Sequence, residues 1–212
     1  MRLPIFAACF FLLIASARAA APGTEIFNGR DFSGWEFVAT PATDIAAVCQ
    51  MKPDGVIAAA GQPTGFLASA REFENYRLHV EWRWPGKPGN SGVLVHISSG
   101  PKDRAWPVCF QIQMKTKSVG DILPMAGATF AEPLNADAKV PQRTHMAPDS
   151  EKPAGEWNVC DVICRDDSIQ VTINGVLQNA VTGCSVHKGK IGFQFEGTPF
   201  ELRNVSIEGL QK

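Results

Sequence analysis

The sequence has almost no net charge. Its 212 residues carry 20 Lys and Arg against 21 Asp and Glu, which gives a formal net charge of −1 at pH 7. A chain so close to balance offers no general electrostatic attraction to nucleic acid or to an anionic membrane, so we expect neither as a partner. Charged residues make up only 19% of the chain and hydrophobic residues 45%, a composition that excludes intrinsic disorder. A chain of this length can bury one sizeable core, so one domain is expected.

Long hydrophobic runs are also missing. The apolar stretch from Ile5 to Ala15 is about half as long as the roughly 20 residues that a membrane-spanning helix needs, so we expect no transmembrane segment. This stretch follows Arg2 and precedes Ala17-Arg18-Ala19, the small-x-small pattern of a signal-peptide cleavage site. We therefore predict a signal peptide over residues 1–19 and a secreted or periplasmic product. A lipoprotein signal is disfavoured because Cys9 lies inside the apolar run.

Metal-ligand spacings are absent. The chain has no Cys-x-x-Cys pair and no His pair at ligand spacing, so the sequence predicts no metal site and no cofactor, although a divalent cation is left open. Five cysteines follow the predicted leader, and an oxidising destination would allow zero to two disulfides. The candidate pairs are Cys49 with Cys184, or Cys109 with another strand cysteine. Cys160 and Cys164 would lie about 13 Å apart on one strand, too far to pair.

Familiar catalytic motifs are missing as well. Gly-x-Ser-x-Gly does not occur, and no Ser-His-Asp arrangement can be read from the order of residues. Gly86–Gly92 is rich in glycine, but no helix pattern follows that could present amide groups to a phosphate.

Helical periodicity is nearly absent, and alternation with a period of two takes its place. Over Phe73–Trp84, apolar and polar side chains alternate, and the apolar set includes Trp82 and Trp84, which we expect in the core. Further strands are expected at Ser91–Ser98, Val108–Met114, Val159–Cys164, Ser168–Ile173, Lys190–Phe195 and Phe200–Ile207. About ten short strands without intervening helices predict an all-β fold, an antiparallel β-sandwich or jelly roll, as a single domain over residues 20–212.

One long segment interrupts this alternation. From Lys115 to Glu156 the chain contains five prolines and no sustained pattern. Segments this long without regular structure are usually lids, binding loops or disordered inserts, so we expect a lid-like loop here. A surface excursion without a function is the alternative.

Polar side chains on three expected strands could converge on one surface. The set, in chain order, is His79, Glu81, Arg83, His96, Gln111 and Gln113. If these strands are neighbours with matching faces, carboxylate, guanidinium, imidazole and amide groups meet in one place. A solvated face of an antiparallel sheet would also be polar, and that alternative stays open. The scarcity of Thr, Lys and Ser, and the mixture of hydrogen-bonding and titratable groups, favour a sugar-binding site.

Two residues outside this set are also candidates. Trp106, beside Pro107 in a loop-rich stretch, could stack on a sugar ring. Glu196 could reach a pocket or simply cap the end of a strand.

Short motifs along the chain resemble the 3-keto-disaccharide hydrolase family. The opening motif is Glu25–Trp35 (EIFNGRDFSGW), and the others follow in family order over essentially the whole chain after the leader. They are Asp54–Ile57, Glu72–Leu78, Glu81–Arg83, Asn90–Val93, Gln111–Gln113, Gly155–Asn158, Asn174-Gly175, Ile191–Gln194 and Arg203–Val205. The chain departs from the family pattern at Gln111, where Glu is usual, at His96, where Arg is frequent, and at Lys115, where Asp is common.

The resemblance implies a concanavalin A-like jelly roll that cleaves 3-keto-glycosides or 3-keto-disaccharides. The ketone at C3 acidifies the C2 hydrogen, so a base can remove it, the aglycone can leave from C1, and water can add afterwards. In this scheme we expect His96 or Glu81 as the base, and Arg83 with Gln113 as hydrogen-bond donors. Gln111, Asn90, Glu156 and Trp106 are expected to contact the carbohydrate.

Two other functions are compatible with this fold. A non-catalytic, lectin-like carbohydrate-binding module would show an open groove lined by Trp and amides, whereas an enzyme would show a titratable group in a pocket. A structural or interaction domain would show an exposed apolar patch and no pocket.

Overall fold

Nearly all regular structure in this chain is β. The computed structural model describes residues 23–211, and the predicted signal peptide at residues 1–19 lies outside the described residues. No helix within residues 23–211 is long and apolar enough to cross a membrane. The helix is α1 (Ile45–Val48), and the strands are β1 (Thr24–Glu25), β2 (Trp35–Ala39), β3 (Cys49–Met51), β4 (Ile57–Ala59), β5 (Gly65–Phe73), β6 (Tyr76–Arg83), β7 (Gly92–Asp103), β8 (Trp106–Gln113), β9 (Ile122–Met125), β10 (Asn158–Arg165), β11 (Ser168–Ile173), β12 (Val176–Val181), β13 (Gly189–Phe195) and β14 (Phe200–Gly209).

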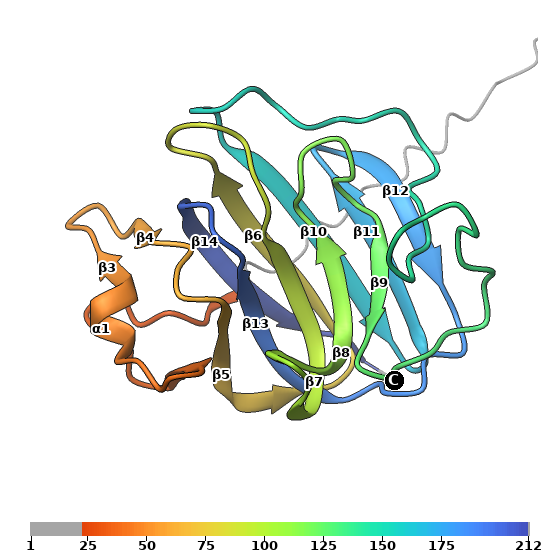
Figure 1. Cartoon of the computed structure of the whole chain (residues 1–212), viewed down its shortest axis with the longest axis horizontal. Helices are drawn as coiled ribbons and strands as arrows, with labels where there is room; N and C mark the ends of the chain where they lie inside the picture. The colour runs from red at the N-terminus through yellow and green to blue at the C-terminus, as the bar shows by residue number, and fades with distance from the viewer. Residues whose placement is uncertain (1–22, 212) are drawn as a thin grey trace, which may run out of the picture.

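The strands form two antiparallel sheets packed face to face (Figure 1). The first sheet has the order β12-β11-β10-β6-β14-β4-β3, with β1 added beside β14. The second has the order β2-β5-β13-β7-β8-β9. This architecture confirms the predicted all-β sandwich, and all seven strands expected from alternation are present, with bounds that differ by a few residues.

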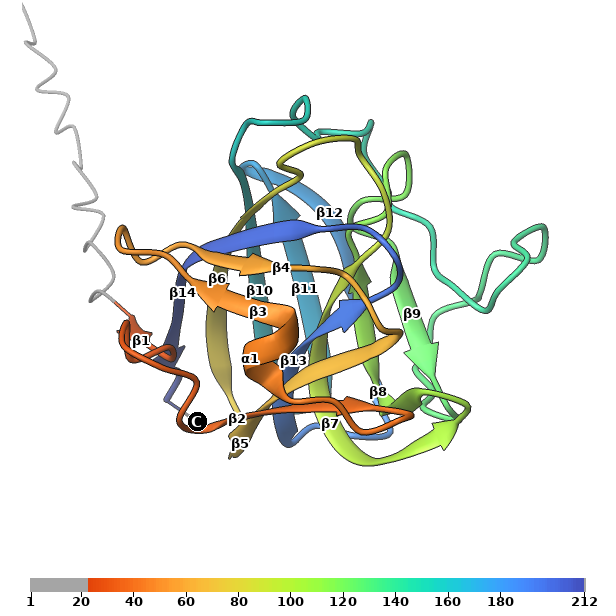
Figure 2. The same cartoon turned by 60° about the vertical axis from the view of Figure 1, so that its left-hand side comes forward.

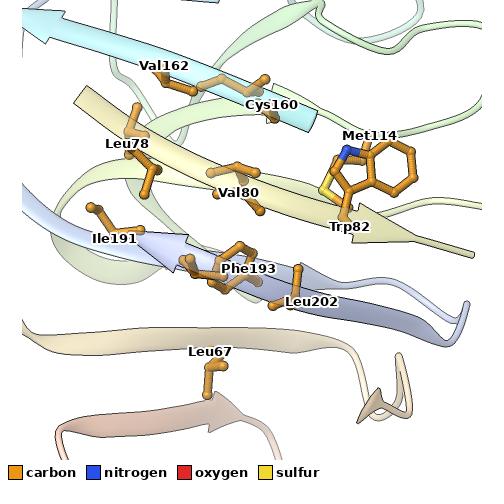
Figure 3. Close-up of a cluster of buried hydrophobic side chains, with 14 of the residues drawn as sticks. Leu67, Leu78, Val80, Trp82, Met114, Cys160, Val162, Ile191, Phe193 and Leu202 are labelled. Atoms are coloured by element: carbon orange, nitrogen blue, oxygen red, sulfur yellow. The ribbon is translucent and has the colours of Figure 1, made fainter. Parts of the chain in front are cut away.

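The core lies between the two sheets. Leu78, Val80 and Trp82 of β6 point inward from the first sheet, and Ile191 and Phe193 of β13 meet them from the second (Figure 3). All five side chains are fully buried. The rings of Trp82 and its neighbour Trp84 pack edge to face with centroids 5.2 Å apart, so both tryptophans lie in the core as predicted. Burial of these large apolar surfaces is the main force that holds the sheets together.

The cysteines form no disulfide within residues 23–211. Cys49, Cys109, Cys160, Cys164 and Cys184 are all free and buried. The expected pairings of Cys49 with Cys184, and of Cys109 with another cysteine, are therefore wrong. Burial raises the pKa of the Cys49 and Cys184 thiols to about 12, so they stay protonated and pack as small apolar groups.

The segment from Lys115 to Glu156 contains a strand that the sequence pattern did not indicate. Strand β9 pairs with β8 and forms the edge of the second sheet. Pro124 fits there because an edge strand does not need every backbone N–H for pairing. The rest of the segment is a long loop that leaves β9 and extends beyond it before the chain reaches β10 (Figure 2).

Candidate functional site

A cavity of about 550 Å³ opens on the outer face of the second sheet. Core residues Phe110 and Phe193 point inward from β8 and β13, so the alternate residues of the same strands point outward into the cavity. The wall comes from the two strands, the tip of the β7–β8 hairpin, β9 and the long loop. The lining residues are Asn90, Asp103, Arg104, Trp106, Gln111, Gln113, Lys115, Leu123, Pro124, Met125, Ala126, Gly127, Val140, Pro141, Gln194 and Glu196.

Three buried amides form the floor of this cavity. Gln111 Nε2 donates to Gln113 Oε1 at 3.1 Å and to Gln194 Oε1 at 3.0 Å. Both hydrogens of the Gln111 amide are thereby used, and the three side chains are held in one fixed arrangement. The backbone N–H of Lys115 also donates to Gln113 Oε1 at 3.2 Å, which fixes the amide orientation of Gln113 further.

Gly92 makes room for this floor. It lies on β7 opposite Gln113, and a Cβ atom at this position would lie 2.6 Å from Gln111 Cγ and 2.8 Å from Gln111 Nε2. No real Cβ contact is that short, so any larger residue would push the Gln111 side chain away. Glycine at position 92 is therefore required by the close approach of the Gln111 amide.

Two buried oxygen atoms beside the floor accept no hydrogen bond within the described part of the chain. They are Gln111 Oε1 and Asn90 Oδ1. Buried polar atoms are nearly always paired in native proteins, and each exception calls for a partner. A ligand with hydroxyl groups could donate to both atoms.

Glu196 brings a carboxylate to the rim of the floor. Its Oε2 accepts a 2.8 Å hydrogen bond from Asn90 Nδ2. Desolvation by the surrounding protein raises the pKa of the Glu196 carboxyl above its usual value of 4.5, and the Lys115 ammonium, the Asn90 hydrogen bond and Arg104 oppose that rise. A carboxylate with a raised pKa is a stronger base than an ordinary glutamate, which suits it to accept a proton.

The long loop is fastened to β9 by a backbone bridge between Ile122 and Arg143 and by one buried carboxylate beside it. Asp121 is 1% exposed, and its Oδ1 accepts from the backbone N–H of His145 at 2.8 Å and lies 2.6 Å from His145 Nδ1. Gln142 Nε2 donates to the other oxygen of Asp121 at 2.8 Å. The cavity residues Val140 and Pro141 come directly before this anchor, so the wall that they form is held in place.

The structure brings four of the predicted substrate-binding residues together. Gln111, Gln113, Asn90 and Trp106 all line the cavity. Glu156 does not line it and is an exposed residue in the turn before β10, where its backbone N–H donates to Pro153. No ligand is present, so a role of the four residues in binding carbohydrate stays a prediction.

The structure separates Glu81 and Arg83 from the cavity. Strand β6 belongs to the first sheet, between β10 and β14, whereas β7 and β8 belong to the second. Because the outer faces of two packed sheets look in opposite directions, the predicted common face of His79, Glu81, Arg83, His96, Gln111 and Gln113 does not form. Consecutive strands in a sandwich can lie in different sheets, and alternation along the sequence cannot reveal that.

Glu81 and Arg83 instead form charge pairs on the outer face of the first sheet. Arg203 Nε donates to Glu81 Oε2 at 2.7 Å, and Arg83 Nε donates to Glu201 Oε2 at 2.6 Å. Lys52 binds the other oxygen of Glu201. Desolvation raises the pKa of Glu81, but hydrogen bonds from Asn204 and Arg203 and the positive charges of Arg203 and His79 outweigh it and hold the pKa below its usual value, which makes Glu81 a weak base.

His96 is buried inside the sandwich rather than facing a ligand. The residue is 1% exposed, its Nδ1 lies 3.1 Å from the carbonyl oxygen of Val186, and its ring packs edge-on against Tyr76. A register shift in β7 after Val95 and a φ of 56° at His96 interrupt the alternation and turn this side chain inward. Desolvation lowers the pKa of His96 to about 4, so the imidazole is neutral at pH 7. His96 also does not line the cavity.

Gln194 was not predicted as a site residue, Lys115 was identified only as a departure from the family pattern, and the role of Glu196 was left open. A signal for two of them was present, because Phe193-Gln194-Phe195-Glu196 alternates in the same way as Phe110-Gln111-Ile112-Gln113. Pairing β13 with β7 and β7 with β8 places these two alternating patterns on the same side of the sheet.

The described residues offer no prebuilt metal centre. Across residues 23–211, no three His, Cys, Asp or Glu side chains are grouped so that they could hold a metal ion.

Comparisons with known proteins identify related families and folds. A family model described as a 3-keto-alpha-glucoside-1,2-lyase-like domain matches residues 22–208. No curated protein gives a significant sequence match.

Several solved structures share the fold. A protein from Parabacteroides distasonis ATCC 8503, described by inference as a glycosyl hydrolase, superposes with a TM-score of 0.65 and 25% identity over 89% of this chain and 94% of that one. The carbohydrate-binding module CBM66 from Bacillus subtilis gives a TM-score of 0.59 at 10% identity, over 83% of this chain and 96% of the module. The β-glucanase of Bacillus licheniformis gives a TM-score of 0.58 at 13% identity, over 90% of this chain and 96% of the glucanase.

Proposed function

The chain belongs to the family of 3-keto-alpha-glucoside-1,2-lyase-like domains, and on this premise we propose that it is a secreted enzyme that cleaves 3-keto-glycosides in the cavity of the second sheet. The family membership confirms the resemblance seen in the sequence motifs. A relative at 25% identity, described by inference as a glycosyl hydrolase, supports an action on glycosides. The observation that carries the proposal is the position of Glu196, an exposed carboxylate that is oriented by Asn90 and lies in the same cavity as a rigid floor of three amides.

The proposed reaction begins with the loss of a proton. The ketone at C3 acidifies the C2–H bond, and Glu196 removes that proton to leave an enolate. The electron pair then forms a C1=C2 double bond as the C1–O bond breaks, and the leaving oxygen takes up the proton that Glu196 removed, which regenerates the carboxylate. Water adds its oxygen to C1 and a hydrogen to C2, so the net result is hydrolysis. This route needs one base, unlike an ordinary glycosidase, which needs two carboxyl groups.

The residues around Glu196 would bind the sugar and the developing charge. Gln111 Oε1 and Asn90 Oδ1 lack hydrogen-bond donors and would accept them from sugar hydroxyl groups. The Nε2 group of Gln113 and the ammonium of Lys115 are available to donate to the enolate oxygen at C3, where preorganised donors stabilise the charge that develops. Trp106 would pack against one face of the ring.

A lectin-like module is the competing function. The amides and Trp106 suit either function, but Glu196 favours catalysis because it places a titratable group, oriented by Asn90, at the rim of the amide floor. The fold alone cannot decide, since both enzymes and binding modules adopt it.

The test is to incubate the processed protein with a 3-keto-glucoside and with its unoxidised parent, and to follow release of the aglycone by mass spectrometry. We expect release from the 3-keto compound alone. Glu196→Gln should reduce the rate by about 10²- to 10⁴-fold, the usual contribution of a general base. Glu81→Gln is the matched control and should leave the rate unchanged because Glu81 lies on the other sheet.

Two outcomes would overturn the proposal. Binding of the 3-keto-glucoside without any cleavage would indicate a lectin-like module. Equal cleavage of the parent glucoside would show that the ketone plays no part in the reaction.

A further inference from the structure

The cavity has two chemically different walls. One is polar and consists of the three amides, Asn90, Lys115 and Glu196, together with Asp103 and Arg104 at the tip of the β7–β8 hairpin. The other comes from β9, which lies beside β8 with Leu123 paired to Gln111, and from the long loop; its residues are Leu123, Pro124, Met125, Ala126, Val140 and Pro141. A ligand that fills the cavity must therefore present a polar part to β8 and β13 and a different part to β9.

The apolar wall offers no side-chain hydrogen bond. None of its six side chains carries a donor or acceptor apart from the weakly accepting sulfur of Met125. Part of its backbone is occupied too, because the carbonyl oxygen of Met125 accepts from Ala128 N at 3.0 Å and proline at 124 has no N–H. A second sugar unit placed here would lose water around its hydroxyl groups and would gain no side-chain donor or acceptor other than the Met125 sulfur, which is unfavourable.

The same wall is well suited to an apolar group. Val140 is 49% exposed and lines the cavity, so its side chain is open to a ligand. The anchor at Asp121 fixes the chain at Gln142, two residues after Val140, so the wall exists before any ligand arrives. A preformed apolar surface binds an apolar ligand without first having to be ordered.

We propose that the aglycone released by this enzyme is apolar, an aryl or cycloalkyl group that packs against Val140, Met125 and Leu123. This inference rests on the proposed function, with the oxidised sugar on the amide floor and the aglycone on the β9 wall. It narrows the substrate class to 3-keto-glucosides of apolar alcohols and away from 3-keto-disaccharides.

The experiment compares 3-keto-glucosides that differ only in their aglycone. Benzyl and methyl aglycones leave as alcohols of similar acidity, so a difference between them reports contact with the wall rather than leaving-group chemistry. We expect kcat/KM to be about tenfold higher for the benzyl compound, equivalent to about 1.4 kcal/mol, with most of the change in KM. A glucosyl aglycone, as in a 3-keto-disaccharide, should be cleaved less efficiently than the benzyl compound.

Substitutions in the apolar wall then test whether it causes the preference for the benzyl compound. Val140→Ser and Met125→Gln should each reduce the ratio of kcat/KM for the benzyl compound to that for the methyl compound to about threefold. The matched control is Leu177→Ser, because Leu177 is 44% exposed but lies on β12, outside the cavity. This variant should retain the full preference.

The outcomes separate this inference from the proposed function. Cleavage of all three compounds with equal kcat/KM would overturn the apolar aglycone and leave the 3-keto-glycoside activity standing. If no compound is cleaved, calorimetric binding of the benzyl and methyl 3-keto-glucosides to the wild type and to Val140→Ser decides the matter. Tighter binding of the benzyl compound that Val140→Ser abolishes would support the apolar wall, and equal binding would overturn it.

Discussion

Asn90 Nδ2 donates a 2.8 Å hydrogen bond to Glu196 Oε2 and so joins the connection between β6 and β7 to the residue that follows β13. Asn90 is thereby both a part of the cavity wall and a modulator of the proposed base. Its side chain offers the sugar an unpaired oxygen while its nitrogen stabilises the charged form of Glu196.

This contact predicts a pH dependence. Glu196 acts as a base only when ionised, so kcat/KM should fall as the pH drops through its pKa, which lies above the usual value of 4.5. Asn90→Leu removes a hydrogen bond that lowers this pKa, and the acid limb of the profile should therefore move to higher pH. Lys115→Met should move it in the same direction. A profile of kcat/KM between pH 4 and 8 measures the shift, and an unchanged limb in both variants would argue against Glu196 as the base.

Gly92→Ala should disturb the amide floor. The new Cβ would lie 2.6 Å from Gln111 Cγ, and Gln111 is buried among its two amide partners and cannot move freely. Overpacking of this kind costs about 1–3 kcal/mol of unfolding free energy, measurable by urea denaturation, and KM should rise. Gly86→Ala is the control, because nothing lies within 4 Å of a Cβ at that position. Equal stability of the two variants would contradict the role of Gly92.

Asp121→Ala should release the long loop. The substitution leaves the His145 backbone N–H and the Gln142 amide without their buried acceptor, at a cost of about 1–3 kcal/mol for each unpaired group. Hydrogen exchange should increase over residues 138–146, and KM should rise because Val140 and Pro141 lose their support. Asp137→Ala, on the exposed part of the same loop, should change neither quantity. Unchanged exchange in Asp121→Ala would contradict the prediction and show that the backbone bridge between Ile122 and Arg143 is sufficient to fix the loop.

Because His96 is buried, we expect the free energy of unfolding to fall in mild acid. Its pKa is about 4 in the folded protein against 6.5 ordinarily, so the unfolded chain takes up a proton first as the pH falls. Stability should therefore fall between pH 6.5 and 4 by on the order of 3 kcal/mol from this residue. In His96→Asn the fall should be smaller, and Asn tolerates the positive φ at this position. Urea denaturation of the wild type and of His96→Asn at several pH values tests this. The raised pKa of His79 also makes stability depend on pH, but its contribution is the same in both proteins and cancels in the comparison. Parallel curves for the two proteins would refute it.

The strands of this fold could be predicted because alternation is a local property. In β6, the apolar residues Leu78, Val80 and Trp82 had to face one side, and they do face the core. The same reasoning placed Gln111 and Gln113 together on the opposite side of β8. It failed for β9, because Pro124 made this short edge strand unrecognisable from its sequence. It also failed for His96, because a register shift in β7 turns the His96 side chain to the opposite face of the sheet.

The partnership of strands could not be predicted in the same way. The sequence by itself determined that the chain forms short strands with one apolar face each, because the side-chain period of a strand is a property of its backbone. Only the tertiary structure decided that β6 and β7, although consecutive, lie in opposite sheets, and that β13 supplies Gln194 beside Gln111 and positions Glu196. Such pairings depend on how all the apolar faces are buried together, a long-range packing problem that no single segment specifies.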